Sequence, residues 1–420
     1  MGRFLLENAR WLSAGLVLTL CSSFGQTYFI SLFAGEIKAT YGLSDGGWGG
    51  IYTLATLGSA ALLVQAGGLA DTRPIGRLAL GVILLYVLVA AGMALNGSVL
   101  VLVVLIAGLR FCGQGMMSHM AMTAMGRWFR ARRGRAVAVA NLGHSLGEAV
   151  LPALTVLAIA WIGWRATWGV AAALLLIGFA PLLAWLLTEH RQPKGIAGAE
   201  LSAGLGGRHW LRHEVLSHWL FWALMPGVLA PSFIGTAVFF HQVHVSEVKD
   251  WPLALMALGY PAYAAVTVVS SLVSGWLADR FGPLTLLPVY LLPMAAGIAL
   301  IAPGEGVGAW QGMMALLGLT QGAAQTLLGA LWPELYGTRS LGSIKALATA
   351  SMVFATAVGP GITGALIDLG LSFPAQCWGL ALWPVLASAA LLAVRARLAA
   401  EFPGDPPRPQ PARARTGGKR

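Results

Sequence analysis

The sequence predicts an all-α, multi-pass membrane protein with twelve transmembrane helices in two six-helix, pseudo-symmetric halves. Three observations support this prediction: a mostly apolar composition, a succession of apolar segments long enough to cross a membrane, and a repeat that relates the two halves. Of the 420 residues, 57% are hydrophobic and only 10% are charged, whereas soluble domains carry about 25% charged residues. So few charges could not solvate the surface of a soluble protein of this size.

Twelve apolar segments are long enough to cross roughly 30 Å of hydrocarbon. A polar stretch separates the first six from the last six, so we expect an N-terminal bundle at 1–187, a central cytoplasmic loop at 188–218 and a C-terminal bundle at 219–397. The Pro- and Arg-rich end at 398–420 is expected to be a disordered cytoplasmic tail. The twelve segments lie at about 11–34, 48–70, 76–95, 98–124, 136–160, 166–187, 219–243, 252–277, 283–302, 309–332, 343–367 and 376–395.

The basic residues predict the orientation in the membrane. All but four of the 27 Lys and Arg residues lie in one set of alternate loops and in the tails, the exceptions being Lys38, Arg110, Arg165 and Lys249. Because cytoplasmic loops carry an excess of Lys and Arg, both termini are expected in the cytoplasm. The net charge of +11 therefore reports topology, and no nucleic-acid partner is expected. The expected location is the plasma membrane, or the inner membrane of a bacterium.

An internal repeat relates the two halves. Gly-Gly-Leu-Ala-Asp at 67–71 recurs as Gly-Trp-Leu-Ala-Asp at 275–279, an offset of 208 residues. Gln-Gly at 114–115 recurs at 321–322, and a Gly and a Pro of the fifth segment recur near the same offset. A fixed offset in corresponding segments indicates two copies of one six-helix unit. Transporters built from such halves place their substrate site near the midplane, between the halves.

These features resemble the major facilitator superfamily. The second loop copy, Gly-Trp-Leu-Ala-Asp-Arg-Phe-Gly at 275–282, fits the loop motif of that family, whereas the first copy has two extra residues before Gly76. Arg110-x-x-x-Gln114-Gly115 resembles the family's second motif. The basic turn at 132–136 and the Gly-rich fifth segment resemble the monocarboxylate and oxalate–formate branch. The resemblance implies a secondary transporter that works by alternating access between its halves.

Two charges lie deep in apolar segments. They are Arg110 in the fourth segment and Glu148 in the fifth. Insertion of a charged side chain at that depth costs about 2.5–3.5 kcal/mol on insertion scales. Gln114 follows Arg110 by one helical turn, and His144 precedes Glu148 by one turn. The four side chains are therefore expected to form one polar cluster in the N-terminal half.

The cluster has two interpretations. In the functional one, the planar guanidinium of Arg110 binds a substrate carboxylate, and Glu148 takes up a proton that releases Arg110 for the substrate. In the structural one, Arg110 and Glu148 form a buried ion pair that only holds the helices together, and His144 is a packing histidine. The sequence leaves both interpretations open.

The C-terminal half offers amides, hydroxyls and aromatic rings in place of charges. Gln321 and Gln325 lie one turn apart in the tenth segment, and no charge is found in the middle of the last six segments. In the first segment, Gln26 and Tyr28 are candidates for the lining of a substrate site. A buried Gln can equally make a hydrogen bond between helices, worth about 0.6 kcal/mol on average.

The repeated loop supplies candidate gating residues. Asp71 and Asp279 end the second and eighth segments, and Arg77 and Arg280 follow them. A carboxylate in this position can bind the N-terminus of a neighbouring helix. If that contact forms in one state and breaks in the other, it biases the equilibrium between the outward and inward forms. The alternative is a solvated turn.

Other motifs are absent from the sequence. His241-x-x-His244 has helical ligand spacing but no third ligand, and Cys21, Cys112 and Cys377 have no paired spacing, so no metal, cofactor or disulfide is expected. Because no phosphate-binding loop or hydrolase motif occurs, no enzyme is expected.

Three functional hypotheses follow. The first is secondary active transport of a small, monocarboxylate-like organic anion, with protons as the candidate coupling ion. The second is efflux of a drug or metabolite by the same fold. The third is a non-transporting receptor or a membrane enzyme. The expected partners are a small-molecule substrate, membrane lipids and protons.

Overall fold

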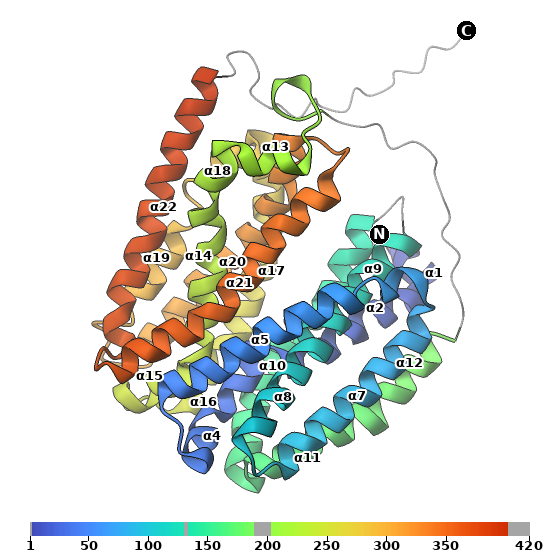
Figure 1. Ribbon diagram of the computed structural model, residues 1–420, viewed down its shortest axis with the longest axis vertical. Coiled ribbons are helices and arrows are strands. Elements are labelled where there is room, and N and C mark those ends of the chain that lie inside the picture. The colour runs from blue at the N-terminus through green and yellow to red at the C-terminus, as the bar shows by residue number, and fades with distance from the viewer. Residues whose placement is uncertain (1, 130–132, 189–202, 402–420) are drawn as a thin grey trace.

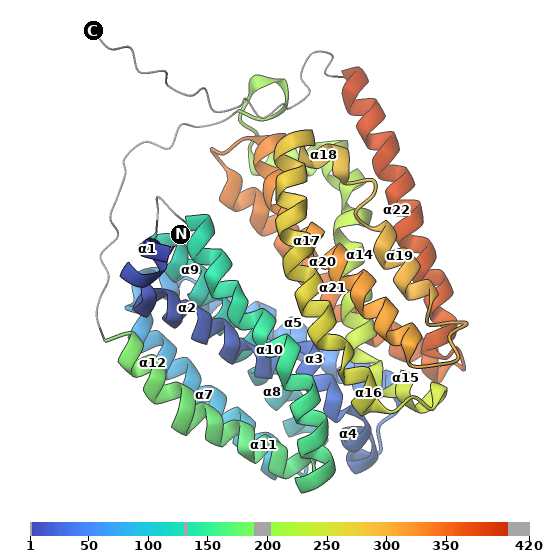
Figure 2. The same cartoon turned by 180° about the vertical axis from the view of Figure 1, so that it is seen from behind.

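The computed structural model describes residues 2–129, 133–188 and 203–401, and every regular element within these ranges is a helix. The helices form two bundles that touch at one end and diverge toward the other (Figure 1). The view from behind shows the same arrangement (Figure 2). The touching end carries α4 (Ala34–Tyr41), α15 (Gln242–Lys249) and α16 (Leu253–Ala257), and we call it the outer face. The opposite end is the inner face.

The N-terminal bundle contains the first half of the predicted segments. Several of its long helices are interrupted by short 3-10 or π-helical turns. Besides α4, its elements are α1 (Gly2–Glu7), α2 (Ala9–Ser22), η1 (Ser23–Gly25), α3 (Thr27–Ile30), η2 (Ser31–Phe33), α5 (Asp45–Ala66), α6 (Leu69–Thr72), α7 (Ile75–Leu95), α8 (Val99–Leu109), η3 (Arg110–Met117), α9 (Ser118–Trp128), α10 (Arg133–Ile162), α11 (Trp164–Ala173), η5 (Leu174–Phe179) and α12 (Ala180–Leu186).

The C-terminal bundle begins with the described end of the central loop, which contains the short helix α13. Besides α15 and α16, its elements are η6 (Leu205–Gly207), α13 (Arg212–Ser217), α14 (Trp219–Phe240), α17 (Gly259–Phe281), α18 (Pro283–Leu286), α19 (Leu292–Ala299), α20 (Gly308–Tyr336), α21 (Leu341–Asp368) and α22 (Phe373–Glu401). The helix α22 continues to Glu401, through the first four residues of the predicted tail. Residues 402–420 and the loop residues 189–202 lie outside the described ranges.

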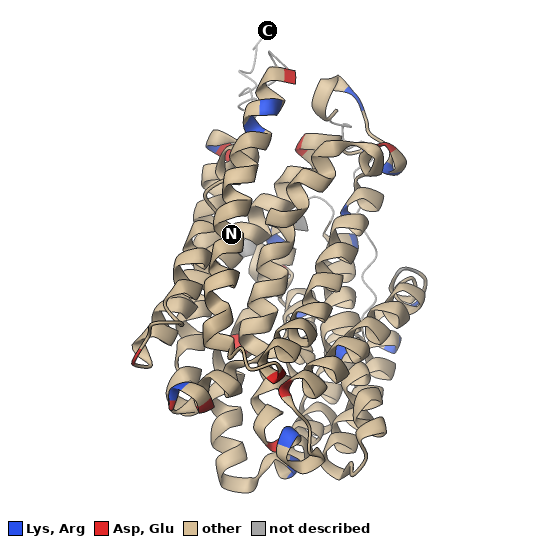
Figure 3. Cartoon of the chain, turned by 60° about the vertical axis from the view of Figure 1, so that its left-hand side comes forward, with Lys and Arg blue, Asp and Glu red and all other residues tan. Residues whose placement is uncertain are grey.

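Membrane-spanning helices dominate both bundles. Within the described ranges, ten helices are long and apolar enough to cross a bilayer, and an eleventh span is the bent pair Ala9–Gly25 and Thr27–Tyr41. Charged residues gather toward the two ends of the bundles (Figure 3), as expected when the middle of each helix faces hydrocarbon. The predicted class, an all-α multi-pass membrane protein, is confirmed.

The predicted ninth segment, 283–302, is not one long helix. It consists of α18 and α19, which are separated by a run of turns at 287–291. Pro288 and Pro293 explain this difference, because proline has no amide hydrogen to donate and its ring clashes with the preceding turn. Pro283 is the first residue of α18, a position that proline favours.

The two bundles contact each other mainly where α5 packs against α21 and where α10 packs against α17. The approach of α5 to α21 depends on glycine. A Cβ on Gly49 would lie 2.4 Å from the Pro360 carbonyl oxygen, and one on Gly364 would lie 2.5 Å from the Asp45 carbonyl oxygen. Small residues allow the backbones of membrane helices to approach this closely.

A tight backbone contact within the N-terminal bundle lies at the end of η1. A Cβ on Gly25 would lie 2.1 Å from the Leu109 carbonyl oxygen and 2.9 Å from the Cα of Gly113. Since both neighbours are backbone atoms, they cannot rotate away as a flexible side chain would. This contact sets the position of the first helix against η3.

We therefore predict that Gly25→Ala destabilises the protein. Overpacking of this kind costs about 1–3 kcal/mol, so the purified variant should unfold at a lower temperature in a thermal-shift measurement. Gly58→Ala in α5 is the control, because a Cβ at Gly58 meets nothing within 4 Å. Equal unfolding temperatures for the two variants would contradict the prediction.

Candidate functional site

The first membrane helix is broken at Gln26. The helix ends with η1 at Gly25, and Gln26 has an extended backbone with φ −84° and ψ 155° before α3 begins. The arms on either side of the break differ in direction by 43°. Interrupted membrane helices leave backbone groups without helical partners, which other parts of the protein must satisfy.

Arg110 provides a hydrogen-bond donor for one of these backbone groups, the Gly25 carbonyl. Its side chain is 1% exposed, and its Nη1 donates to the Gly25 carbonyl oxygen at 3.2 Å and to Thr27 Oγ1 at 3.3 Å. The guanidinium carbon lies 5.1 Å from the centroid of the Tyr52 ring, a distance suited to a cation–π interaction. Arg110 thus joins the two arms of the first helix on either side of Gln26.

The predicted pair of Arg110 and Glu148 is absent. No ion pair joins the two side chains in the described part of the chain, and Arg110 does not line the cavity described below. The interpretation of the pair as a mutual brace is therefore wrong. The physical reason is the break of the first helix, which brings the Gly25 carbonyl oxygen within reach of Arg110 Nη1. The other two guanidinium nitrogens of Arg110, Nε and Nη2, have no hydrogen-bond partner among the described residues.

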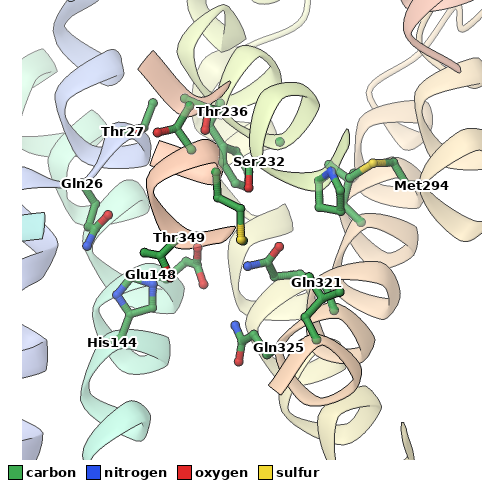
Figure 4. A pocket seen from close by; sticks show the side chains of 18 of the residues that line it. Gln26, Thr27, His144, Glu148, Ser232, Thr236, Met294, Gln321, Gln325 and Thr349 are labelled. Atoms are coloured by element: carbon green, nitrogen blue, oxygen red, sulfur yellow. The ribbon is translucent and has the colours of Figure 1, made fainter. Parts of the chain in front are cut away.

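A cavity of about 380 Å³ lies between the two bundles. His144 and Glu148 occupy one side of it, and the amides of Gln321 and Gln325 occupy the other (Figure 4). The polar lining from the N-terminal half consists of Gln26, Thr27, Tyr28, His144 and Glu148. The polar lining from the C-terminal half includes Ser232, Thr236, Tyr263, Gln321, Gln325, Lys345, Thr349 and Thr356.

Glu148 faces the cavity because α10 packs closely on α2. A Cβ on the neighbouring Gly147 would lie 2.0 Å from Ser23 Oγ, so this face of α10 is occupied and the next side chain projects into the cavity. Glu148 is 6% exposed, and no hydrogen bond or ion pair to another described residue is found for its carboxylate. His144, one turn earlier, lies edge-on to the Tyr28 ring at 6.0 Å between centroids.

The opposite wall comes largely from α20. A Cβ on Gly322 would lie 2.2 Å from the Thr267 carbonyl oxygen of α17, and this close packing directs Gln321 and Gln325 toward the cavity. Tyr263 of α17 also lines the cavity. Tyr260 is fully buried beside it.

Sequence reasoning found six of the polar cavity residues, but it placed Gln114, like Arg110, wrongly. Gln114 is half-buried in η3 and is not part of the lining. The cavity also includes Lys345, which the sequence placed with the loop charges, and the hydroxyls of Ser232, Thr236 and Thr349. No pattern marks these residues, because serine and threonine are common in membrane helices and the depth of the cavity depends on how far the bundles diverge.

The candidate gating residues lie near the inner ends of their helices. Arg77, Asp279 and Arg280 are exposed, and the Asp71 side chain lies outside the described part of the structure. The Arg280 guanidinium carbon lies 5.3 Å from the centroid of the Phe281 ring. Their gating role stays a prediction.

The geometry predicts which cysteines a membrane-impermeant thiol reagent can reach. Gln325 is exposed in the cavity, so Gln325→Cys should be labelled in vesicles that present the inner face. The wild-type protein is the matched control, because Cys21, Cys112 and Cys377 are all buried. Rapid labelling of Cys112, two residues from Arg110, would contradict the separation of Arg110 from the cavity.

Comparisons with known proteins agree with this architecture. The profile of the family described as "Major Facilitator Superfamily" matches residues 15–360 and 262–419. The chain is 28% identical over 405 residues to an uncharacterized 38 kDa protein of Thermoproteus tenax, covering 95% of this chain and 99% of that protein. It is 26% identical over 212 residues to the membrane sensor protein UhpC of Escherichia coli, covering 44% of this chain and 46% of that protein.

Two solved structures share the fold. A bacterial homologue of the human lysosomal transporter Spinster, inward-facing and occupied, aligns with a TM-score of 0.68 at 16% identity, covering 95% of this chain and 97% of that chain. The nucleoside transporter NupG aligns with a TM-score of 0.69 at 11% identity, covering 91% and 99%. None of these matches selects the monocarboxylate branch, which stays a prediction. The chain belongs to the major facilitator superfamily, and it has the fold of a membrane transporter rather than that of an enzyme.

Proposed function

We propose that this protein is a secondary active transporter that moves a small organic anion together with a proton by alternating access. The observation that carries the proposal is the position of Glu148. Its carboxyl group faces the cavity without a hydrogen bond or ion pair to any described residue. A carboxyl group in contact with the substrate space and not bound to a counter-ion is free to take up and release a proton.

The charge balance of the N-terminal half favours an anion. Arg110 is a buried cation without a paired carboxylate among the described residues, and it lies directly behind the cavity wall because it bonds Thr27, a lining residue. When Glu148 is ionised, the N-terminal wall and the space directly behind it hold one negative and one positive charge. Once Glu148 is protonated, the positive charge is uncompensated in a medium of low dielectric constant, and an anionic substrate would restore the balance.

The rest of the lining suits a small polar molecule. The amides of Gln26, Gln321 and Gln325 can donate to a carboxylate, and Lys345 adds a positive charge to the lining. The cavity volume of about 380 Å³ falls in the range typical of small-molecule sites, about 300–1,000 Å³. These features support a monocarboxylate-like substrate.

We further propose that the two loop copies close the inner face in the other state of the cycle. Asp71 with Arg77, and Asp279 with Arg280, follow corresponding helices of the two halves. The distribution of basic residues supports an inner face in the cytoplasm, with both termini there, in a plasma or inner membrane. The proposed units are the bundles at 1–187 and 219–397, with the loop at 188–218 and the tail at 398–420.

A second candidate is efflux of an amphipathic drug or metabolite. The observation that favours it is that Glu148 lines the cavity whereas Arg110 does not, so a cationic amphiphile could bind the carboxylate directly and pack on Phe239 and Trp332, which also line the cavity. A sensor role is a third candidate, because part of the chain resembles a protein named as a membrane sensor.

The test is transport by the protein reconstituted in liposomes. An inward proton gradient should drive accumulation of a labelled monocarboxylate from a panel of such anions. Absence of uptake for every anion together with dye efflux from cells would favour the second candidate. Ligand-induced thermal stabilisation without any transport would favour a sensor, since a ligand that binds only the folded state raises its stability.

Substitution of the carboxyl group tests the coupling. Glu148→Gln should abolish accumulation driven by the proton gradient, because the amide cannot exchange a proton. It should spare exchange of labelled for unlabelled substrate, which needs no net proton movement. Glu305→Gln is the control, because Glu305 is exposed and lies outside the cavity lining. Unchanged driven uptake in Glu148→Gln would show that another group carries the proton.

A further inference from the structure

The outer ends of the two bundles are joined by polar contacts that the transport site does not use. Five of the contacting groups are charged or titratable, and they come from α4 and α5 in one half and from α15 and α21 in the other. A transporter that opens to the outer face must break every contact between the halves at this end. These contacts therefore bear on the balance between the inward and outward forms.

The first contact is between Asp368 and the beginning of α5. Asp368 Oδ2 accepts a hydrogen bond from Ser44 Oγ at 2.7 Å and another from the Gly46 amide at 3.1 Å. Gly46 lies in the first turn of α5, where amide groups lack helical partners and the helix dipole favours an anion. Asp368 is the last residue of α21, so one half of the protein supplies the anion for a helix N-terminus of the other half.

This contact depends on the absence of a side chain at Gly46. A Cβ there would lie 2.3 Å from Asp368 Oδ2. Ser44 also accepts a hydrogen bond from the Gly47 amide at 3.0 Å, so the serine caps α5 from within its own half and donates its proton to Asp368. The Ser44 hydroxyl and the Gly46 amide thus form a binding site for the Asp368 carboxylate.

The second contact is an ionic cluster around Asp45. Lys38 Nζ lies 2.9 Å from Asp45 Oδ1, and His244 Nδ1 lies 3.4 Å from Asp45 Oδ2. Lys38 Nζ is also 3.7 Å from Glu247 Oε2. His244 Nε2 accepts the Phe373 amide at 3.5 Å, which assigns the imidazole proton to the nitrogen that faces Asp45. Lys38 and Asp45 belong to one half and the other two to the second half.

A third set of contacts, around Gln242, lies between this cluster and the cavity. Gln242 is fully buried, and its Nε2 donates to Ser31 Oγ at 2.8 Å, whereas its Oε1 accepts the Tyr260 hydroxyl at 3.0 Å. Ser31 in turn donates to the Phe239 carbonyl oxygen at 2.7 Å. Since Phe239 lines the cavity, the polar contacts extend from the cavity to the outer face.

We propose that the Asp368 contact with the N-terminus of α5 is the latch of a gate at the outer face, and that the Lys38–Asp45–His244–Glu247 cluster and Gln242 complete it. The latch holds the inward form and must release before the protein opens outward. Because Ser44 and Asp368 are exposed, water can replace their hydrogen bonds, so the latch is weak enough to break in every cycle. The inference rests on alternating access but on no particular substrate.

Cysteine labelling tests the latch. The reporter is Gln321→Cys in the cavity, labelled by an impermeant reagent from the outer face of right-side-out vesicles. Removal of the Asp368 charge by Asp368→Asn should raise the outer labelling rate by about two- to five-fold, the range expected for one charge at an exposed helix N-terminus. Labelling from the inner face should fall at the same time, because the two forms exchange.

Asp250→Asn is the matched control. Asp250 is an exposed carboxylate at the end of α15 on the same face, with no contact to the N-terminal half found among the described residues. It should leave both labelling rates unchanged. Equal rates for Asp368→Asn, Asp250→Asn and the unsubstituted reporter would overturn the proposal, and because labelling requires no substrate, that failure is distinct from a failure of the proposed function.

A disulfide cross-link gives a second measurement, which does not require that Asp368→Asn folds. The double variant Ser44→Cys/Asp368→Cys should form a disulfide under oxidation that traps the inward form. In the same reporter background, outer labelling should then be lost and return with a reductant, whereas inner labelling persists. Free outer labelling of the oxidised, cross-linked protein would overturn the proposal.

Discussion

A guanidinium buried among membrane helices needs partners inside the protein, because hydrocarbon offers none. Arg110 finds them at the break of the first helix, where it bonds Gly25 and Thr27 and stacks on Tyr52. Because the helix breaks here, Gln26, Thr27 and Tyr28 line the cavity. The close contact of Gly25 with η3 therefore holds the Gly25 carbonyl oxygen where Arg110 can bond it. The N-terminal wall of the cavity depends on both contacts.

The cavity walls divide the chemistry between the halves. The N-terminal wall holds the ionisable pair of His144 and Glu148, and most of the C-terminal wall is made of amides, hydroxyls and aromatic rings. In the transport cycle we propose, the wall with Glu148 exchanges the proton and the facing wall contacts the substrate, so different residues would select the coupling ion and the substrate.

The helices α5 and α21 run antiparallel across the contact between the bundles, and α21 ends with the carboxylate of Asp368. At the outer face Asp368 bonds the N-terminus of α5. Glycines on both helices keep the backbones close enough for this contact to form.

Much of the fold could be predicted from the sequence. The number and spacing of apolar segments, the repeat and the distribution of basic residues are properties of the chain, and hydropathy acts residue by residue along it. The depth of Glu148, Gln321 and Gln325 follows from the same count. These residues therefore appeared as cavity candidates before their geometry was known.

Only the tertiary structure decided the partner of Arg110 and the composition of the outer gate. Arg110 bonds a carbonyl group 85 residues away, which is available only because the first helix breaks at Gln26. Ser44 and Asp368 are 324 residues apart, and neither stands out in its own segment. Backbone groups have no sequence signature, and contacts across the bundles depend on the closeness of helix packing, so these interactions become visible only when both halves are in place.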